Sequence, residues 1–372
     1  MFNALKNLSK GTLILIGTVI FLPIFIIILL VILQSCSTGT SYDKYESKMI
    51  TAASKYFNDK KLLPESNTDS TLVTLDALVS GGYIKSPEKL FKDKNCEGYV
   101  SVRNNGYVKE LDLSGKPNYN VYLKCDNYKT NTLKDNIMND LVTSGSGLYE
   151  DGNYYVFKGD NPKNVINFYG KLYRILSIDK DGVARLVKAE NEMSTRPWDN
   201  KYNVEANYSY GKSIFKDSYI LKILLADYSN DKIISKKARE HIVSHDICIG
   251  KRDKDDKSIS FDLDCSDVLN EQVISLVNVS DFARASLDPD CNSIDGRSCR
   301  NYNYLYEVLN NTWTLNSASN NSYEVFYLSS GVAQVATASD YNEYNIIIYI
   351  DGDETVKSGN GTINDPYIIN NN

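Results

Sequence analysis

The sequence predicts an α+β protein that follows a membrane anchor and becomes strand-rich toward its C-terminus. Three observations predict this class. Residues 12–33 form an uncharged apolar run, residues 41–63 carry apolar side chains at steps of three and four, and many segments beyond residue 96 alternate apolar and polar side chains between turn residues. These patterns are typical of a membrane helix, an amphipathic helix and β-strands, in that order.

Length and composition limit the possible function classes. The chain has 372 residues, enough for two or three domains, with 42% hydrophobic and 24% charged residues. Its formal net charge is -6, and no basic run is interleaved with aromatic residues, so nucleic acid is not an expected partner. Only two histidines occur, His241 and His245, which removes the commonest general base and metal ligand from nearly all of the chain. The composition favours binding or scaffolding.

The apolar run at residues 12–33 has the length of a membrane span. At about 1.5 Å per residue it reaches about 33 Å, against a hydrocarbon core of about 30 Å. Signal peptides have shorter apolar regions, so a retained anchor is favoured over a cleaved one. Lys6 and Lys10 precede the run without an acidic residue. The positive-inside rule therefore places residues 1–11 in the cytoplasm and everything after Ser35 outside the cell membrane.

Two processing alternatives concern the ends of this run. Residues 33–36 (LQSC) resemble a bacterial lipobox, in which Cys36 would be lipidated, but Gln34 is atypical and the apolar stretch is too long. Residues 10–14 (KGTLI) resemble the start of a prepilin, although Leu15 stands where a glutamate belongs. We expect a retained, pilin-like anchor, and lipidation at Cys36 stays open.

The cysteines agree with an exported chain. Six of the seven lie in the predicted exterior, and an even set there indicates disulfide bonds. No close C-x-x-C pair occurs, which argues against zinc. Spacing alone cannot choose the connectivity. Sequence proximity favours Cys96 with Cys125, Cys248 with Cys265, and Cys291 with Cys299.

The elements nearest the anchor are predicted in order. Residues 41–63 form a stalk helix that ends before Pro64. Residues 71–84 repeat the helical pattern and end at a Gly-Gly cap. Residues 96–125 predict a meander of three strands, with a cystine between the first and the third. Residues 64–130 are thus a small α+β domain of the size that uses a disulfide for stability.

The larger part of the chain follows a helix and a Ser/Gly linker at residues 131–153. Residues 154–369 form the predicted C-terminal surface domain, in which residues 218–228 and 231–245 read as helices and the remainder as short strands. Residues 179–182 (DKDG) resemble the start of a calcium loop, but the other acidic ligands of such a loop are missing, so we expect a hairpin turn.

Candidate chemistry is sparse. His241 and His245 are four residues apart on a predicted helix, but the zincin glutamate and a third ligand are missing, so we expect a satisfied surface pair. Cys291 or Cys299 would need a free thiol to act as a nucleophile, and pairing is favoured. The acidic segments 253–256 and 351–354 read as solvated turns, with calcium binding the less favoured alternative. No cofactor is expected.

The two tryptophans are the remaining candidates. Trp198 and Trp313 read as core residues rather than as a carbohydrate platform. Together with Asp199 they are nevertheless the best ligand-binding candidates that the sequence offers.

An ordered set of short motifs carries a family resemblance. It includes residues 144–177, 198–200 (WDN), 277–286 (VNVSDFARAS), Cys291 with Cys299, 303–306 (NYLY), 312–315 (TWTL) and 358–369 (SGNGTINDPYII). Together they resemble the C-terminal domain of unknown function in membrane-anchored, pilin-like surface proteins of low-GC Gram-positive bacteria. By analogy the motifs are also similar to C-type-lectin-like and formylglycine-generating-enzyme-like folds. Asn345 stands where the family has an arginine, so no site built on that arginine is expected here.

The expected function is therefore non-catalytic. The resemblance and the anchor imply a single-pass cell-surface protein for recognition, adhesion or assembly, with the lipid bilayer and a surface glycan or protein as partners. The alternative is a pseudopilin-like subunit of a pilus or secretion machine, which self-associates through the apolar helix. An ectoenzyme is the third and least favoured class. The ligand and the oligomeric state stay open.

Overall fold

The computed structural model of the chain describes residues 41–65, 69–91, 93, 95–106, 108–189 and 194–369. The predicted cytoplasmic tail, the apolar run at residues 12–33 and Cys36 lie outside this part. Among the described helices, none combines the length and the apolar character needed to cross a membrane. The chain divides into two compact units, Met1–Tyr45 and Glu46–Asn372. The described part is strand-rich α+β, which confirms the predicted class.

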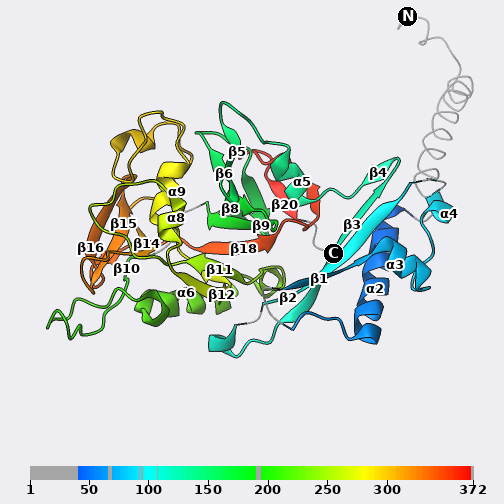
Figure 1. Cartoon of the computed structure of the whole chain (residues 1–372), viewed down its shortest axis with the longest axis horizontal. Coiled ribbons are helices and arrows are strands. Elements are labelled where there is room, and N and C mark those ends of the chain that lie inside the picture. Colours follow the sequence, from blue (N-terminus) through cyan, green and yellow to red (C-terminus); the bar gives the residue numbers. More distant parts are fainter. Residues whose placement is uncertain are drawn as a thin grey trace, which may run out of the picture. The chain divides into compact units, whose positions relative to one another are not determined.

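A long helix and a small antiparallel sheet come first. Helix α2 spans Tyr42–Lys60, as the apolar spacing predicts. The sheet has the order β1-β2-β3-β4, and Figure 1 shows α2 beside it. Phe57 of α2 is fully buried, with its ring centroid 6.3 Å from that of Tyr119 in β3. The strands are β1 (Ser70–Thr74), β2 (Glu97–Asn105), β3 (Lys116–Cys125) and β4 (Tyr128–Lys129).

Two predictions for this region are wrong in part. Residues 71–84 begin as strand β1 and become helix α3 (Leu75–Ser80) only after Thr74, whose side chain accepts a hydrogen bond from the Ala77 N–H and caps the helix. β-Branched residues favour the strand, and a threonine cap favours the new start. The expected middle strand of the meander is replaced by a 3-10 turn, η2 (Lys109–Leu111), so β2 pairs directly with β3. Helix α4 (Glu88–Phe91) is short.

A nine-stranded sheet organises the C-terminal part, counted over the described residues. Its strands are antiparallel except for the last, β20, which pairs in parallel with β7. The turn at residues 179–182 joins β8 to β9 as predicted, and the Asp179 carboxylate accepts the Val183 N–H at 2.8 Å. The strands are β5 (Gly147–Asp151), β6 (Tyr154–Lys158), β7 (Val165–Phe168), β8 (Lys171–Asp179), β9 (Val183–Lys188), β13 (Ile274–Ser275), β18 (Ile347–Asp351), β19 (Val356–Ser358) and β20 (Tyr367–Ile369).

A second, three-stranded sheet lies on the other side of two short helices, α8 and α9 (Figure 1). Every residue of α9 is buried, and Asp281 of this helix forms an ion pair with Arg185 of β9. The remaining strands are β10 (Arg196–Pro197), β11 (His245–Cys248), β12 (Val268–Gln272), β14 (Thr312–Ser317), β15 (Glu324–Ser329), β16 (Val332–Thr337) and β17 (Tyr341–Asn342). The helices are α5 (Leu133–Met138), η3 (Phe215–Asp217), α6 (Tyr219–Ser229), α7 (Lys236–Arg239), α8 (Phe261–Asp264), α9 (Val279–Arg284) and η4 (Arg297–Arg300).

The predicted linker at residues 131–153 belongs to the C-terminal sheet. The Leu133 N–H donates to the Glu354 carbonyl at 2.8 Å, and β5 pairs with β6 along its whole length. A boundary at residue 154 would therefore divide a β-hairpin. Backbone hydrogen bonds hold this segment to the rest of the sheet, and both lie within the compact unit Glu46–Asn372.

The acidic turn at residues 351–354 is not the solvated turn that we expected. Asp351 forms an ion pair with Arg103 at 2.7 Å, and Asp353 accepts a hydrogen bond from the Tyr99 hydroxyl at 3.0 Å. Glu354 lies 2.8 Å from Nδ1 of His241 and accepts from Asn118 at 3.2 Å. Strands β2 and β3 therefore bind this turn through its carboxylates.

The His241 contact predicts a pH-dependent contribution to stability. Burial lowers the pKa of His241, but the hydrogen bond from its ring to Glu354 and the charges of Glu354 and Glu240 outweigh burial and leave this pKa raised. Because the pKa of His241 is higher in the folded than in the unfolded protein, protonation of His241 stabilises the folded state. This contribution is complete below the unfolded pKa of about 6.5 and is lost as the pH rises through the folded pKa. We expect wild type to exceed the variant His241→Gln in stability by up to about 1 kcal/mol at low pH.

Urea unfolding of both proteins between about pH 6 and about pH 9 measures this difference. The gap between wild type and variant should narrow as pH rises. A gap that is constant with pH would contradict the assignment of the His241 charge to the Glu354 contact.

Candidate ligand-binding groove

The residues that the sequence offered as ligand contacts are structural. Trp198 and Trp313 are both fully buried, and the two indoles cross-link neighbouring segments. Trp198 Nε1 donates to the Thr314 carbonyl at 3.1 Å, and Trp313 Nε1 donates to the Arg196 carbonyl at 2.8 Å. Asp199, also fully buried, accepts from the backbone N–H groups of Tyr219 and Lys212. Because neither indole ring is exposed, the residues predicted to contact a ligand are structural instead.

The described cysteines form the three disulfides that sequence proximity favours, which confirms the disulfide prediction. Neither Cys291 nor Cys299 is a free thiol in this structure. The pairs are Cys96–Cys125, Cys248–Cys265 and Cys291–Cys299.

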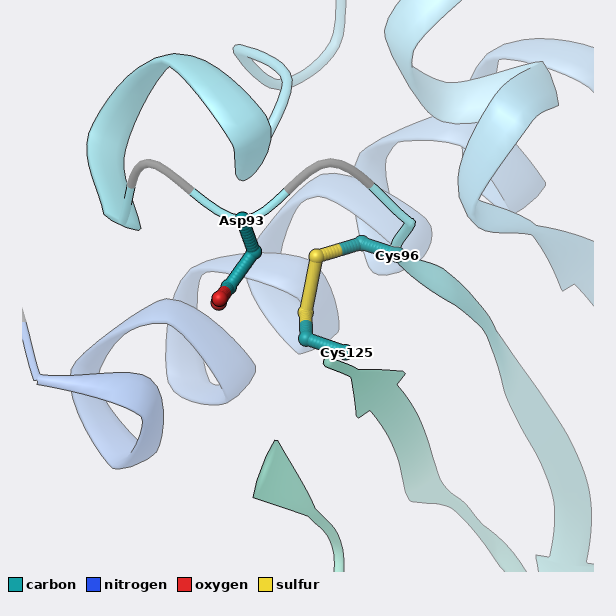
Figure 2. A group of neighbouring side chains, drawn as sticks. All are labelled: Asp93, Cys96 and Cys125. Atoms are coloured by element: carbon teal, nitrogen blue, oxygen red, sulfur yellow. A yellow bond between two sulfur atoms is a disulfide. The ribbon is translucent and has the colours of Figure 1, made fainter. Parts of the chain in front are cut away.

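One acidic side chain lies beside the first disulfide (Figure 2). Ligand atoms of Asp93, Cys96 and Cys125 lie within 4.8 Å of one another. Asp93 is buried and accepts a hydrogen bond from Asn127 at 3.0 Å. Because a metal is bound by thiolates and these two sulfurs are joined to each other, the group is structural in this state.

The two histidines do not share a helix face. Residues 242 and 243 are extended, α7 ends at Arg239, and His245 begins β11. Nε2 of His245 lies 2.9 Å from Asp179, and its ring stacks on Tyr349 at 4.9 Å. The expected surface pair is therefore wrong, since each histidine is largely buried and bound to a different carboxylate. Sequence reasoning missed the Asp179 partner because it is 66 residues away.

His245 lines a cavity of about 390 Å³ together with Arg103 and Ser244. Nδ1 of His245 and the Ser244 hydroxyl are buried without a hydrogen-bond partner among the described residues. Burial raises the pKa of Asp179, but the hydrogen bonds from His245 and the Val183 N–H outweigh burial and leave it lowered. The Asp179 carboxylate orients the His245 imidazole in the way that the imidazole of a general base is oriented.

A larger groove, of about 800 Å³, lies between the β5–β6 hairpin and two disulfide-bonded segments. One segment precedes and includes α8, where Cys265 lines the groove and is bonded to Cys248. The other follows α9, where Cys291 lines the groove and is bonded to Cys299. A disulfide therefore borders the groove on each of these two segments.

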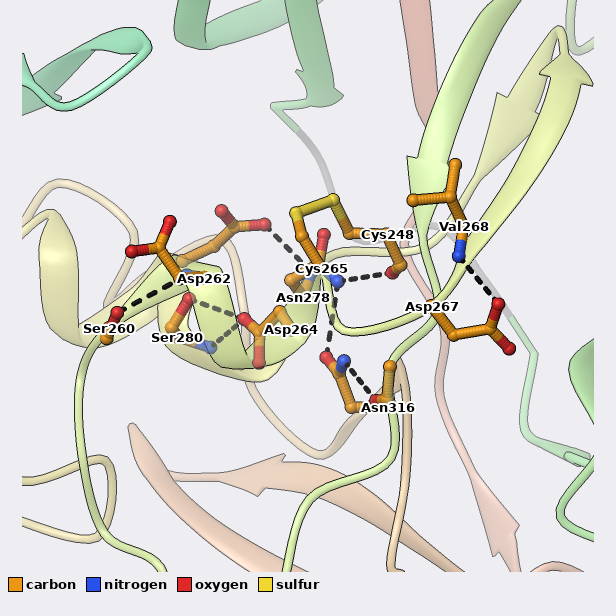
Figure 3. Close-up of a disulfide and its surroundings, with 12 residues drawn as sticks. Cys248, Ser260, Asp262, Asp264, Cys265, Asp267, Val268, Asn278, Ser280 and Asn316 are labelled. Atoms are coloured by element: carbon orange, nitrogen blue, oxygen red, sulfur yellow. Dashed lines mark hydrogen bonds between the residues drawn. A yellow bond between two sulfur atoms is a disulfide. The ribbon is translucent and has the colours of Figure 1, made fainter.

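Buried polar groups fix the wall that contains α8 (Figure 3). Asn278 Nδ2 donates to the Cys248 carbonyl at 2.7 Å, and Asn316 Nδ2 donates to the Gly250 carbonyl at 3.0 Å. The Ser280 hydroxyl donates to Asp264 of α8 at 2.5 Å. All three donors are buried, and the bond from Ser280 to Asp264 joins α9 directly to α8.

Arg284 is one of the two cations that line the groove, and its side chain is 4% exposed. Its Nε donates to Asp151 at 3.0 Å, and its Nη1 lies 3.9 Å from Asp281. The guanidinium also lies 4.5 Å from the Phe261 ring centroid. Its Nη2 has no hydrogen-bond partner among the described residues.

Lys158 is the second cation of the groove. Its ammonium lies 5.6 Å from the Tyr149 ring centroid, and within the described part of the chain it forms no ion pair. Burial lowers the pKa of Lys158; the charge of Asp151 opposes this change, and the charge of Arg284 adds to it. Lys158 is therefore a half-buried charge that lacks a dedicated counter-ion.

Sequence reasoning missed the groove residues, although a signal was present. The groove residue Arg284 and its neighbour Asp281 belong to residues 277–286, one of the motifs of the family resemblance. An aspartate and an arginine three residues apart inside an otherwise uncharged motif indicate a buried ion pair. Their partners Arg185 and Asp151 lie 96 and 133 residues away, and no local pattern connects them.

Together the fold and the groove describe a disulfide-bonded, strand-rich α+β protein with a groove beside the β5–β6 hairpin. A comparison of the chain with protein-family models, curated proteins and solved structures finds no match.

Proposed function

We propose that this protein is a membrane-anchored cell-surface protein that recognises a glycan or protein ligand in the groove beside the β5–β6 hairpin. The observation that carries the proposal is the groove itself, because two disulfides border it and its lining residue Arg284 has an Nη2 without a hydrogen-bond partner among the described residues. A preformed site loses little conformational entropy on binding. Such an arrangement favours recognition.

Two features support the location. Disulfides persist in oxidising compartments such as the bacterial exterior, and all six cysteines beyond residue 36 are paired. The apolar run at residues 12–33 with its flanking lysines supports an anchor whose N-terminus is cytoplasmic. The resemblance to pilin-like surface proteins points to the same location.

The topology can be measured on intact cells. Protease added from outside should degrade the chain beyond Ser41 without permeabilisation, since the charge bias places this region outside. Antibodies against an N-terminal tag and against the C-terminal part follow the two ends separately. Protection of the C-terminal part until the cells are opened would reverse the proposed orientation.

The second candidate is a pseudopilin-like structural subunit. Helix α2 follows the apolar run and packs on a four-stranded antiparallel sheet, an arrangement in which an anchor helix could associate with copies of itself. Polymers on the cell surface would favour this function.

An ectoenzyme remains the third candidate. The oriented Asp179–His245 pair favours it, whereas the Ser244 hydroxyl forms no hydrogen bond to the imidazole. A nucleophile–base contact is the geometric requirement for a serine hydrolase.

A bulky side chain at the groove tests the recognition function. Asn153 is an exposed residue of the β5–β6 turn that lines the groove, and Lys180 is an exposed residue of the β8–β9 turn that does not. Cells that display the full chain should bind a panel of surface glycans and proteins, and Asn153→Trp should weaken that binding at least about tenfold. Lys180→Trp, the matched control, should bind like wild type. Equal binding by all three proteins would remove the groove from the proposal.

A further inference from the structure

A second groove, which we call the α6 groove, has a volume of about 570 Å³. No described residue lines both this groove and the one beside the β5–β6 hairpin. Residues of η2 form one part of its lining, and residues of η3 and α6 form another. Ile214 of the lining is 50% exposed, so apolar surface is accessible here. The apolar lining residues are Leu111, Ile214, Leu221 and Leu225.

Positive charge predominates in the lining of the α6 groove. Four lysines and two carboxylates line it, whereas the chain as a whole has a net charge of -6. Lys216 and Lys222 are exposed and therefore accessible to a ligand. None of the four lysines forms an ion pair with another described residue. The groove therefore attracts a negatively charged ligand. Its charged lining residues are Lys201, Lys212, Lys216, Lys222, Glu110 and Asp217.

The start of helix α6 adds no free backbone donor to this charge. Its first three N–H groups all donate within the chain, to a carboxylate, a carbonyl and a hydroxyl oxygen. A phosphate at the start of a helix is bound by such N–H groups when they are free, so phosphate is not the ligand that this groove favours. The pairs are Tyr219 with Asp199 at 3.1 Å, Ile220 with Trp198 at 2.8 Å, and Leu221 with Ser218 at 3.1 Å.

A loop with exposed apolar side chains continues from the groove. Residues 201–212 begin and end at lining lysines, and the Gly211 N–H closes the loop by donating to the Lys201 carbonyl at 3.0 Å. Asn203 is buried, and its Nδ2 donates to the Gly211 carbonyl at 2.8 Å. Exposed apolar groups beside a groove, tyrosines above all, are typical of protein interfaces. The exposed side chains are Tyr202 (53%), Val204 (75%) and Tyr208 (60%).

The combination of lysines and apolar surface restricts the ligand class. A densely charged polymer would be repelled by Glu110 and Asp217 and would leave the apolar lining unused. A peptide segment with acidic side chains beside apolar ones matches both features. Its carboxylates meet the lysines, and its apolar side chains cover Ile214 and the neighbouring leucines.

We propose that the α6 groove and the adjoining loop bind an acidic peptide segment of a partner protein, in which aspartate or glutamate accompanies apolar side chains. Lys216 and Lys222 bind its carboxylates, while Ile214 and the exposed tyrosines of the loop contact its apolar side chains. This second binding surface goes beyond the proposed function, because it needs neither the β5–β6 groove nor the ligand of that groove.

Three synthetic peptides of equal length test the proposal on the full-length chain in nanodiscs of a zwitterionic lipid. One contains glutamate and leucine, the second has glutamine in place of each glutamate, and the third has glutamine in place of each leucine. Fluorescence anisotropy of labelled peptides should show that the first binds at least about tenfold tighter than either of the others. Empty nanodiscs measure binding to the lipid alone. Added salt should weaken the binding, because exposed charges are screened.

Variants assign the contact to this groove. The double variant Lys216→Gln, Lys222→Gln should weaken binding of the first peptide at least about tenfold and reduce its dependence on salt. Ile214→Ser should weaken the same binding severalfold. Lys180→Gln is the matched control, since Lys180 is exposed and lies outside the groove. Asn153→Trp, which tests the other groove, should bind the peptide like wild type. Thermal unfolding of each variant shows that it is folded.

Each contradicting outcome is specific. Equal binding of the first and second peptides, unchanged binding in the double variant, or no binding of any peptide would overturn the acidic-peptide assignment. Equal binding of the first and third peptides would overturn the apolar contact. Displacement of the peptide by phosphatidylglycerol vesicles at equal negative charge would identify an anionic membrane surface instead. Dimers that form without peptide and are lost in the double variant would identify a second copy of this chain as the occupant.

Discussion

Replacing Asp281 with asparagine should lower the free energy of unfolding by about 3–5 kcal/mol, the usual result of removing one partner from a buried ion pair. The variant keeps the shape of the side chain but leaves Arg185 and Arg284 buried without their shared carboxylate. It also weakens the capping box at the start of α9, in which Asp281 accepts the Asn278 N–H at 2.8 Å. Urea unfolding of wild type and variant measures the loss.

An exposed ion pair provides the control for this prediction. Lys124 and Glu97 lie 3.0 Å apart with more than half of each side chain exposed, so Glu97→Gln should cost less than about 1 kcal/mol. Similar small losses for both variants would show that the buried charges at α9 are screened.

The second large effect is expected at the disulfide between Cys248 and Cys265. Replacing both cysteines with alanine should lower the free energy of unfolding by about 3 kcal/mol, because the bond closes a loop with a sequence separation of 17 and restricts the unfolded chain. Ligand binding should weaken as well, since Cys265 lines the groove. Denaturant unfolding and the binding screen, carried out on the same variant, separate the two effects.

The shorter disulfide is the comparison for this variant. Cys291 and Cys299 are separated by only 8 residues, and the chain-entropy relation gives about 2.5 kcal/mol for their replacement. A loss of stability in the Cys248 and Cys265 variant without any loss of ligand binding would show that the α8 wall is held by its hydrogen bonds alone.

The sequence predicted the elements whose signals are local. Helix α2 follows from apolar residues at helical spacing, and the β8–β9 turn follows from the Asp-x-Asp-Gly segment. The disulfide pairs follow from proximity along the chain. Residues 231–245 show the limit of such signals. Their composition suits a helix, but the Val243 N–H donates to the Tyr349 carbonyl at 2.9 Å, so the backbone there pairs with a strand instead of continuing a helix. Pairing with a distant strand outweighs local propensity there.

The groove could not be predicted for a related reason. Arg284 and Phe261 come together with Lys158 only after three separate parts of the chain have packed. The predicted ligand residues could not be assigned from the sequence either, because a tryptophan suits both a binding platform and a core. The hydrogen bonds of Trp198 and Trp313 to backbone carbonyls of neighbouring segments show that both belong to the core.

If the chain is exported as proposed, the strand order of the nine-stranded sheet constrains when it can fold. Strand β18 lies between β13 and β9, and the last strand, β20, pairs with β7, which precedes it by about 200 residues. A chain that crosses the membrane from its N-terminal end cannot close this sheet until its final residues have emerged. All three disulfides, by contrast, join cysteines separated by at most 29 residues. In an exported chain these disulfides can therefore form before the sheet closes, so oxidation can precede folding.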